Sequence, residues 1–198
     1  MFALVESGSI TKMMNGNKGI TIGDNQYPAA IFTLWTEAER NAIGVYTIEI
    51  DNTNKKDEAW YINTDISYAF GSGKVTGSYG TATARAIADA NAKDKNGDDL
   101  DPVVVIKGLK TIKKELIDSQ CAGILADSDW MVVKSTETGT TMDSGWKTWR
   151  ASVRTKCNSM QTQIDNAANV DALAALFTYT EQEDKSITRP LGEFPVKE

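Results

Sequence analysis

The strongest constraint on the fold is a run of apolar residues at helical spacing in the C-terminal part of the chain. Seven of them recur at steps of 3, 4, 4, 3, 4 and 3: Trp146, Trp149, Val153, Cys157, Met160, Ile164 and Ala167. Steps of three and four place side chains on one narrow face of an α-helix, and such a face is typical of a helix that packs on a partner helix. The spacing therefore predicts a helix over about residues 144–168, capped by Asp143 or Ser144.

A second apolar stripe precedes this helix and predicts its partner. Its members recur at near-helical spacing, and they are Val105, Leu109, Ile112, Leu116 and Ile124. Asp101 and Pro102 have the order of an N-cap residue followed by proline in the first helical turn. We therefore predict a helix over about residues 102–126 that packs against the following one as a helical hairpin.

The N-terminal part of the chain has the patterns of strands and turns instead. The segments Phe2–Glu6 and Ile10–Met14 flank Ser7-Gly8-Ser9, and this order predicts a hairpin. One short helix is expected after Thr36, because Thr36 and Glu39 have the spacing of a capping box. The pattern is that of a compact β-rich module with one helical insertion.

These patterns together predict an α+β fold with two parts. A β-rich module covers residues 1–82, and a helical region with an extended C-terminal tail covers residues 83–198. Within that region, the alanine-rich segment 83–93 is expected to be helical, and residues 131–135 are expected to be extended. A last short helix is expected over residues 170–177, where an asparagine can cap it.

Three of the five tryptophans lie close together at the predicted turn between the long helices, and they are Trp130, Trp146 and Trp149. Burying three indoles would contribute on the order of 10 kcal/mol at ~25 cal/mol per Å² of apolar surface. In one interpretation they form the nucleus of the hairpin, and Trp146→Ala would then cost ~3–5 kcal/mol. In the other they form a contact surface, because indoles often anchor interfaces.

Basic residues alternate with these tryptophans. Lys147, Arg150 and Arg154 are three or four residues apart, so they line one side of the predicted helix. They can pair inside the chain and lock the turn, they can bind a partner protein, or they can meet nucleic-acid phosphates. The carboxylates available for a lock are Asp127, Asp129 and Asp143. As candidate protein-contact residues we therefore take Trp130, Trp146, Lys147, Trp149, Arg150 and Arg154.

The groups that ordinary catalysis needs are missing or scattered. The chain has no histidine, which removes the commonest general base and metal ligand. The segment Asp94–Asp99 does not match a calcium loop, because Asp99 replaces the glycine and Val105 the glutamate. Cys121 and Cys157 have no metal-ligand or redox spacing and are expected to be buried free thiols. We therefore expect no catalytic, cofactor or metal site, and a protein that is not an enzyme.

Net charge and hydropathy argue against two classes of partner, nucleic acid and membrane. The net charge is −6 and the pI is about 4.8, which argues against a general affinity for nucleic acid or anionic membrane. No apolar run approaches the roughly 18–20 residues of a membrane span. An acidic residue already at position 6 argues against a signal peptide, so synthesis in a cytoplasm is expected.

Four motifs follow one another in the second half of the chain: Leu109–Leu116, Ile124–Trp130, Glu137–Gly139 and Trp146–Arg154. This ordered set resembles a family of bacteriophage tail proteins, the tail-fibre assembly chaperones and related small tail proteins. The family pattern is a helix ending in Leu-Ala-x-(Thr/Ser)-Asp-Trp, a short linker, and then Trp-x-x-Tyr-Arg-x-x-Leu-Arg. This chain departs from the pattern in having Trp149 for tyrosine, Val153 for leucine and Lys134 where an arginine often follows. The N-terminal hairpin and β segments, residues 1–80, are more loosely similar.

The resemblance implies a virion component of the tail, made in the host cytoplasm, that binds other tail or fibre proteins. A homo-oligomer is expected as well, because helix pairs of this size often complete their core with a second copy. It leaves open an assembly chaperone that is not retained in the particle. A different class of function is a carbohydrate-binding module. In that hypothesis, Trp35, Trp60 and Tyr68 form a sugar-stacking platform on the sheet.

Overall fold

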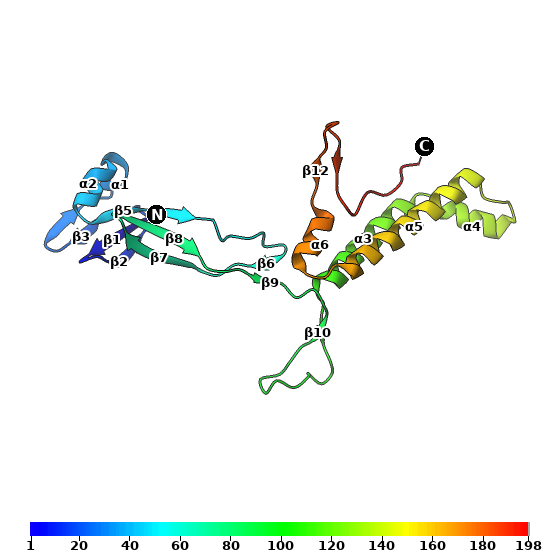
Figure 1. Cartoon of the computed structure of the whole chain (residues 1–198), viewed down its shortest axis with the longest axis horizontal. Coiled ribbons are helices and arrows are strands. Elements are labelled where there is room, and N and C mark those ends of the chain that lie inside the picture. The colour runs from blue at the N-terminus through cyan, green and yellow to red at the C-terminus, as the bar shows by residue number, and fades with distance from the viewer. Residues whose placement is uncertain (198) are drawn as a thin grey trace. The chain divides into compact units, whose positions relative to one another are not determined.

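The computed structural model describes residues 1–197 and divides into two compact units, residues 1–83 and 84–198 (Figure 1). The first unit is built mainly of strands and the second mainly of helices, so the predicted α+β class is confirmed. The boundary expected from composition, between residues 82 and 83, is adjacent to this division.

The first unit is organised by a five-stranded sheet. The strand order is β2-β1-β5-β8-β7, with bounds Ser9–Met14, Phe2–Glu6, Val45–Asp51, Lys74–Tyr79 and Ile66–Gly71. Strands β5 and β8 are parallel, and the other neighbours are antiparallel. The edge strands β2 and β7 also contact each other, so the sheet is curved.

Two tight turns set the register of the antiparallel pairs. Ser7 and Gly8 have φ values of 50° and 79° between β1 and β2, and Ser72 and Gly73 have 53° and 75° between β7 and β8. Two successive residues with positive φ are the mark of a type I′ turn, which matches the twist of a hairpin. The predicted N-terminal hairpin is therefore confirmed.

The two faces of the sheet pack on different cores, because successive side chains of a strand point to opposite faces. On one face Leu4 and Val45 pack with Ile31 and Phe32 of α1 (Ile31–Leu34). Ile20 of the β3–β4 hairpin (Ile20–Ile22 and Asn25–Tyr27) completes this core. The other face carries a second core, made of Ala3, Val5, Ile48 and Val75.

Helix α2 (Glu37–Ala42) has the capping box that the sequence predicts. The Thr36 hydroxyl accepts the Glu39 N–H at 3.3 Å, and the Glu39 carboxylate accepts the Thr36 N–H at 2.7 Å. Gly44 follows with a φ of 82°, and a Cβ there would lie 2.7 Å from the Val5 carbonyl oxygen. Glycine is therefore required where the chain enters β5. Beyond the main sheet, β6 (Tyr61–Ile62) pairs with β9 (Thr83–Ala84).

Four helices form the body of the second unit. They are α3 (Leu109–Ala126), α4 (Asp129–Thr138), α5 (Ser144–Asn166) and α6 (Val170–Phe177). Two short antiparallel pairs accompany them: β10 (Ala90–Asn91) with β11 (Val105–Ile106), and β12 (Thr180–Glu181) with β13 (Ile187–Thr188). Helices α3 and α5 lie side by side, and α4 continues from α3 at the far end (Figure 1).

The core of this unit is the apolar face of α5 that the sequence predicts. Its buried residues, together with the C-cap residue Ala167, form what we call the seam: Val153, Cys157, Met160, Ile164 and Ala167. They face the buried residues of α3, which are Leu109, Ile117, Cys121 and Leu125. The antiparallel arrangement is tied by Lys114 and Asp165, whose charged atoms are 2.8 Å apart. The predicted helical hairpin and the predicted helices around 144–168 and 170–177 are confirmed.

The predicted helix over residues 102–126 begins too early. Gly108 is the N-cap of α3, and the Leu109 and Lys110 N–H groups donate to the Ala86 and Ile87 carbonyls. Residues 103–106 are a consecutive β-branched run, which suits a strand better than a helix. The predicted stripe is also rotated, because Ile112 is 46% exposed while Ile117 is fully buried.

Two further local predictions are wrong. The alanine-rich segment 83–93 forms β9 and β10 and no helix, because helix propensity is a weak preference that strand pairing overrides here. Residues 131–135 lie inside α4 and are not extended. The chain has already turned at Ser128, whose hydroxyl donates to the Leu125 carbonyl at 2.9 Å, so a new helix begins at once.

The tail after α6 first forms the β12–β13 hairpin and then packs on α5. Leu191 is fully buried, and the Lys156 ammonium group donates to its carbonyl at 2.8 Å. No helix within residues 1–197 combines the length and the apolar character that a membrane crossing needs.

Candidate interaction site at the α4–α5 end

The clustered tryptophans lie at one end of the helical unit. We call this region the α4–α5 end, and it comprises α4, the linker 139–143 and residues 144–154 of α5. Trp130 is 57% exposed, while Trp146 and Trp149 are half-buried. The interpretation of the three indoles as a buried nucleus is therefore wrong. Helix α4 has only 10 residues and none of them is buried, so it cannot cover the indoles as α3 covers the seam.

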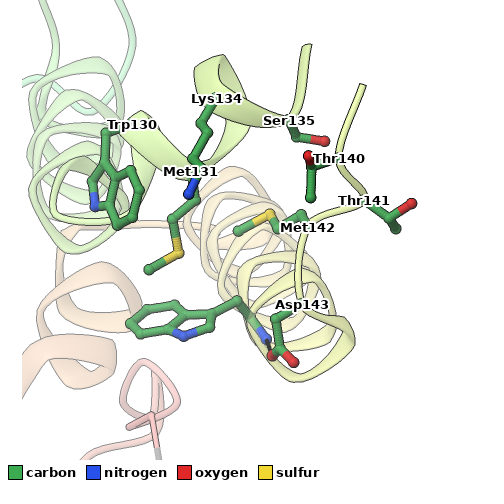
Figure 2. Close-up of a pocket in the computed structure, with 9 residues that line it drawn as sticks. Trp130, Met131, Lys134, Ser135, Thr140, Thr141, Met142 and Asp143 are labelled. Carbon is green, nitrogen blue, oxygen red and sulfur yellow. Dashed lines mark hydrogen bonds between the residues drawn. The ribbon is translucent and has the colours of Figure 1, made fainter. Parts of the chain in front are cut away.

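An apolar pocket of about 310 Å³ opens between α4 and the start of α5. Its lining is Trp130, Met131, Lys134, Ser135, Thr140, Thr141, Met142, Asp143 and Trp146. Figure 2 shows the side chains of Met131 and Met142 between the part of α4 that carries Trp130 and the start of α5. Thioethers are flexible and polarisable, so they adapt to an inserted apolar group.

The two half-buried indoles are held in place from several sides. Their rings meet edge to face, with centroids 5.5 Å apart. The Trp149 indole N–H donates to the Pro195 carbonyl at 3.0 Å, and the Lys197 ammonium nitrogen lies 5.4 Å from the Trp146 ring centroid. Asp143 caps α5 by accepting the Trp146 N–H at 3.1 Å. The pocket wall on the α5 side is therefore preorganised.

Arg150 is an internal lock. Its side chain is buried, at 4% exposure, although it follows directly after Trp149. One guanidinium nitrogen donates to the Leu125 carbonyl at 2.8 Å and to the buried Ser128 hydroxyl, and the other pairs with Asp129 at 2.5 Å. These bonds fasten the α3–α4 turn onto α5. The structure thus realises the intramolecular alternative for Arg150, with Asp129 as the partner.

The other two basic residues remain at the surface. Lys147 and Arg154 are exposed and line a second hollow of about 380 Å³, on which Arg150 also borders. Neither has a carboxylate within ion-pair distance in the described part of the chain. Of the three basic residues predicted to form one row, Arg150 therefore points into the protein, while Lys147 and Arg154 face solvent.

The apolar pocket and the basic hollow are adjacent. Ser135, Thr141 and Met142 line both of them. The combined surface presents indole and thioether groups beside two unpaired cations. Met131, Met142 and Lys134 were not among the candidate residues from the sequence. They come close to Trp146 because α4 is a helix. The sequence does not indicate this helix, because the β-branched residues Val132 and Val133 favour a strand.

Several carboxyl groups of the described residues have pKa values shifted in the same direction. Hydrogen bonds lower the pKa of several carboxyl groups below their ordinary values, and these are Glu39, Asp51, Asp89, Asp94, Asp99 and Asp184. A general acid at neutral pH needs the opposite shift. Burial, together with Cys121 nearby, raises the pKa of Cys157 to about 11, so this thiol is a poor nucleophile.

Within residues 1–197, no three His, Cys, Asp or Glu side chains are grouped so that they could hold a metal ion. The two cysteines are free and buried, as predicted. The lining of the α4–α5 end suits two kinds of contact, apolar insertion and pairing with an anionic group.

The aromatic residues of the sugar-platform hypothesis do not share one surface. Trp60 is buried, and Tyr68 packs on the core of Ala3 and Val5. Trp35 packs instead on the core of the opposite sheet face. Three residues on different faces cannot stack on one sugar chain, so this platform is not formed.

Comparisons of the chain with protein-family models, curated proteins and solved structures found no match.

Proposed function

We propose that this chain is a non-enzymatic bacteriophage tail protein that acts through protein–protein contact at the tail or the tail-fibre junction. In this proposal the α4–α5 end is its contact surface. The observation that carries the contact function is the pocket between α4 and α5, where an exposed tryptophan lies beside two methionines and a second indole. The resemblance of residues 109–154 to small phage tail proteins spans this same region.

The composition of this surface fits a protein interface. Interface cores are enriched in aromatic residues, methionine and arginine, and their energetic anchors cluster in pockets. Exposing Trp130 to water has a free-energy cost that a partner would relieve. The lining supplies apolar anchors in the centre, with Lys134 and the exposed Lys147 and Arg154 at the margin.

The proposal excludes turnover because the pocket holds no suitable acid–base pair. Asp143 is the one carboxylate in its lining, and it caps α5 through the Trp146 N–H. Lys134 lies 5.8 Å from the Trp130 ring centroid, where it supports an indole. These contacts position a binding surface and supply no proton-transfer chain.

The direct test combines particle composition with site variants. Mass spectrometry of purified particles of the encoding virus should detect the chain in a fixed ratio to other tail proteins. Chain present in infected cells and absent from particles would favour the assembly-chaperone alternative. Immobilised chain should also capture tail or fibre proteins from the infected-cell lysate. Capture through the α4–α5 end is distinguished from non-specific capture by comparing the unmodified chain with two matched variants.

The matched variants are Trp130→Ser and Leu34→Ser. Both residues are exposed, Leu34 at 79%, but Leu34 lies in the first unit far from the pocket in sequence. Loss of capture with Trp130→Ser and retention with Leu34→Ser would support the assigned surface. Equal capture by both variants would contradict it.

A further inference from the structure

The β10–β11 hairpin exposes a second apolar surface, at the other end of α3. The consecutive residues Val103 to Ile106 are each between 49% and 59% exposed. The two strands pair Ala90 with Ile106 and Asn91 with Val105, and no third strand joins them in the described part of the chain. A two-stranded hairpin is only marginally stable alone. An exposed apolar patch on such a hairpin is a candidate site for binding another protein surface.

The same hairpin carries unpaired negative charge. Of its aspartates, Asp94 accepts the backbone N–H groups of Asn96 and Asp98, and Asp99 pairs with Lys93 at 2.5 Å. The carboxylates of Asp98 and Asp101 have no ion-pair partner within residues 1–197. The hairpin thus combines the exposed apolar segment Val103–Ile106 with two carboxylates, those of Asp98 and Asp101, that form no ion pair within residues 1–197.

The α4–α5 end has the complementary combination. It presents an apolar pocket around Trp130 and Trp146 beside the unpaired cations Lys147 and Arg154. Apolar surface matches apolar surface, and the unpaired Asp98 and Asp101 of the hairpin are opposite in charge to Lys147 and Arg154. Complementarity therefore exists between two surfaces of the same polypeptide.

These two surfaces cannot readily meet within one copy. The hairpin is anchored at the start of α3, where the Gly108 N–H donates to Asp89 at 2.8 Å and the Leu109 N–H donates to Ala86 at 2.9 Å. The α4–α5 end follows the last residue of α3, which has 18 residues. At 1.5 Å per residue the helix separates the two sites by about 27 Å. The occupant that fits is a second copy.

We infer that the β10–β11 hairpin of one copy docks on the α4–α5 end of another. The Val103–Ile106 segment covers Trp130 and the methionine pocket, and Asp98 and Asp101 approach Lys147 and Arg154. Because the two surfaces differ, the contact is head-to-tail and generates a ring or a filament. This inference rests on the proposed function, since it names the partner of the same contact surface.

Charge reversal in the full-length protein tests the contact. Sedimentation velocity over a concentration series should show self-association of the unmodified chain, weakened by salt. Asp98→Lys with Asp101→Lys, or Lys147→Glu with Arg154→Glu, should each weaken association at least ~10-fold, since several ion pairs become repulsive. Mixing the two double variants should restore association, because each then supplies the surface that the other complements.

The control is a double reversal of exposed aspartates in the first unit, Asp24→Lys with Asp65→Lys, which should leave association unchanged. Circular dichroism of every variant checks that helix content is retained. A chain that stays monomeric at all concentrations overturns the inference, as does self-association that both reversals leave intact. The second outcome would instead indicate symmetric pairing of two β11 edges.

The two proposals can fail separately. A monomeric chain that still loses capture of tail proteins with Trp130→Ser would overturn only the head-to-tail contact. Charge-dependent self-association by a chain that neither enters particles nor captures tail proteins would overturn only the tail function.

Discussion

Helix α5 contains two stretches with the same apolar spacing and different surroundings. From Val153 to Ala167, the spaced residues form the seam and are almost completely covered by α3 and α6. From Trp146 to Arg150, the same rhythm continues, but both indoles are only half-buried. The difference shows that helical spacing selects a face, while the length of the facing element decides whether that face becomes core or contact surface.

Arg150 lies at the boundary between the buried and the half-buried stretches of α5. It lies between Trp149 and Val153 in the apolar row and is itself buried. At this end of the seam its guanidinium donates to the Leu125 carbonyl, near the end of α3, and to the Ser128 hydroxyl. On the side of Arg150 away from the seam, the apolar pocket opens between α4 and the start of α5.

The largest expected effect lies in the seam. Ile164→Ala removes a fully buried side chain and should lower the free energy of unfolding by ~2–5 kcal/mol, because it leaves a cavity. Urea denaturation followed by circular dichroism measures the change. The matched control Ile112→Ala makes the same chemical change on the exposed side of α3 and should cost less than ~1 kcal/mol. Similar losses for both variants would mean that the seam is not the core.

The next effect belongs to the lock. Arg150→Ala should cost ~2–4 kcal/mol, because it removes the buried guanidinium bonds to the Leu125 carbonyl and the Ser128 hydroxyl and leaves a cavity where the side chain was. Asp129→Asn removes only an exposed ion-pair partner and should cost less than ~1 kcal/mol. Chemical denaturation of the two variants separates the buried bonds from the salt bridge. A stable Arg150→Ala protein that has lost partner binding would reassign this arginine to the contact surface.

A smaller loss is expected for the half-buried indole. Trp146→Ala should cost ~1–2 kcal/mol, less than the ~3–5 kcal/mol of a fully buried tryptophan, because part of its surface already faces water. Trp130→Ala should change stability by less than ~1 kcal/mol while weakening partner capture. Thermal unfolding and capture measured on the same samples would distinguish core from contact. A loss of stability at Trp130 comparable to Ile164 would contradict the assignment.

The smallest effect at neutral pH concerns the thiol in the seam. Burial, with Cys121 as a neighbour, raises the pKa of Cys157 from an ordinary 9.0 to about 11 in the folded chain. The unfolded state therefore releases its proton first, so this contribution to stability is present below about pH 9 and is lost as the pH rises toward about 11. Denaturation between pH 8 and 11 should show a fall that is shallower in Cys157→Ala. Identical pH profiles would show that this thiol does not titrate differently on folding.

Much of the fold follows from local rules that need no knowledge of distant residues. The seam spacing predicts α5, and Asn169 caps α6 as expected, with its side chain accepting the Ala172 N–H at 2.9 Å. The turn at Ser7-Gly8 and the capping box at Thr36 are equally local, because each is set by residues within one turn. Such features are visible in sequence since their partners are three or four residues away.

The candidate site was only partly visible in this way. Clustering of Trp130, Trp146 and Trp149 identified the right end of the hairpin, and their exposure could not be read from spacing. The start of α3 was misplaced because its N-terminal backbone bonds to Ala86 and Ile87, more than twenty residues away. The helical state of α4 depends on the turn at Ser128, which Arg150 secures from another helix.

Residue order alone therefore determined that a β-rich module precedes a helical hairpin, because hydrophobic period and turn chemistry are properties of neighbouring residues. The tertiary arrangement decided which apolar groups are covered and which charges are neutralised. A short α4 leaves Trp130 in water, and Asp129 engages the buried Arg150, while Lys147 and Arg154 stay free of carboxylates within residues 1–197. Burial and ion pairing depend on what lies opposite in space, and that is settled only when helices from different parts of the chain meet.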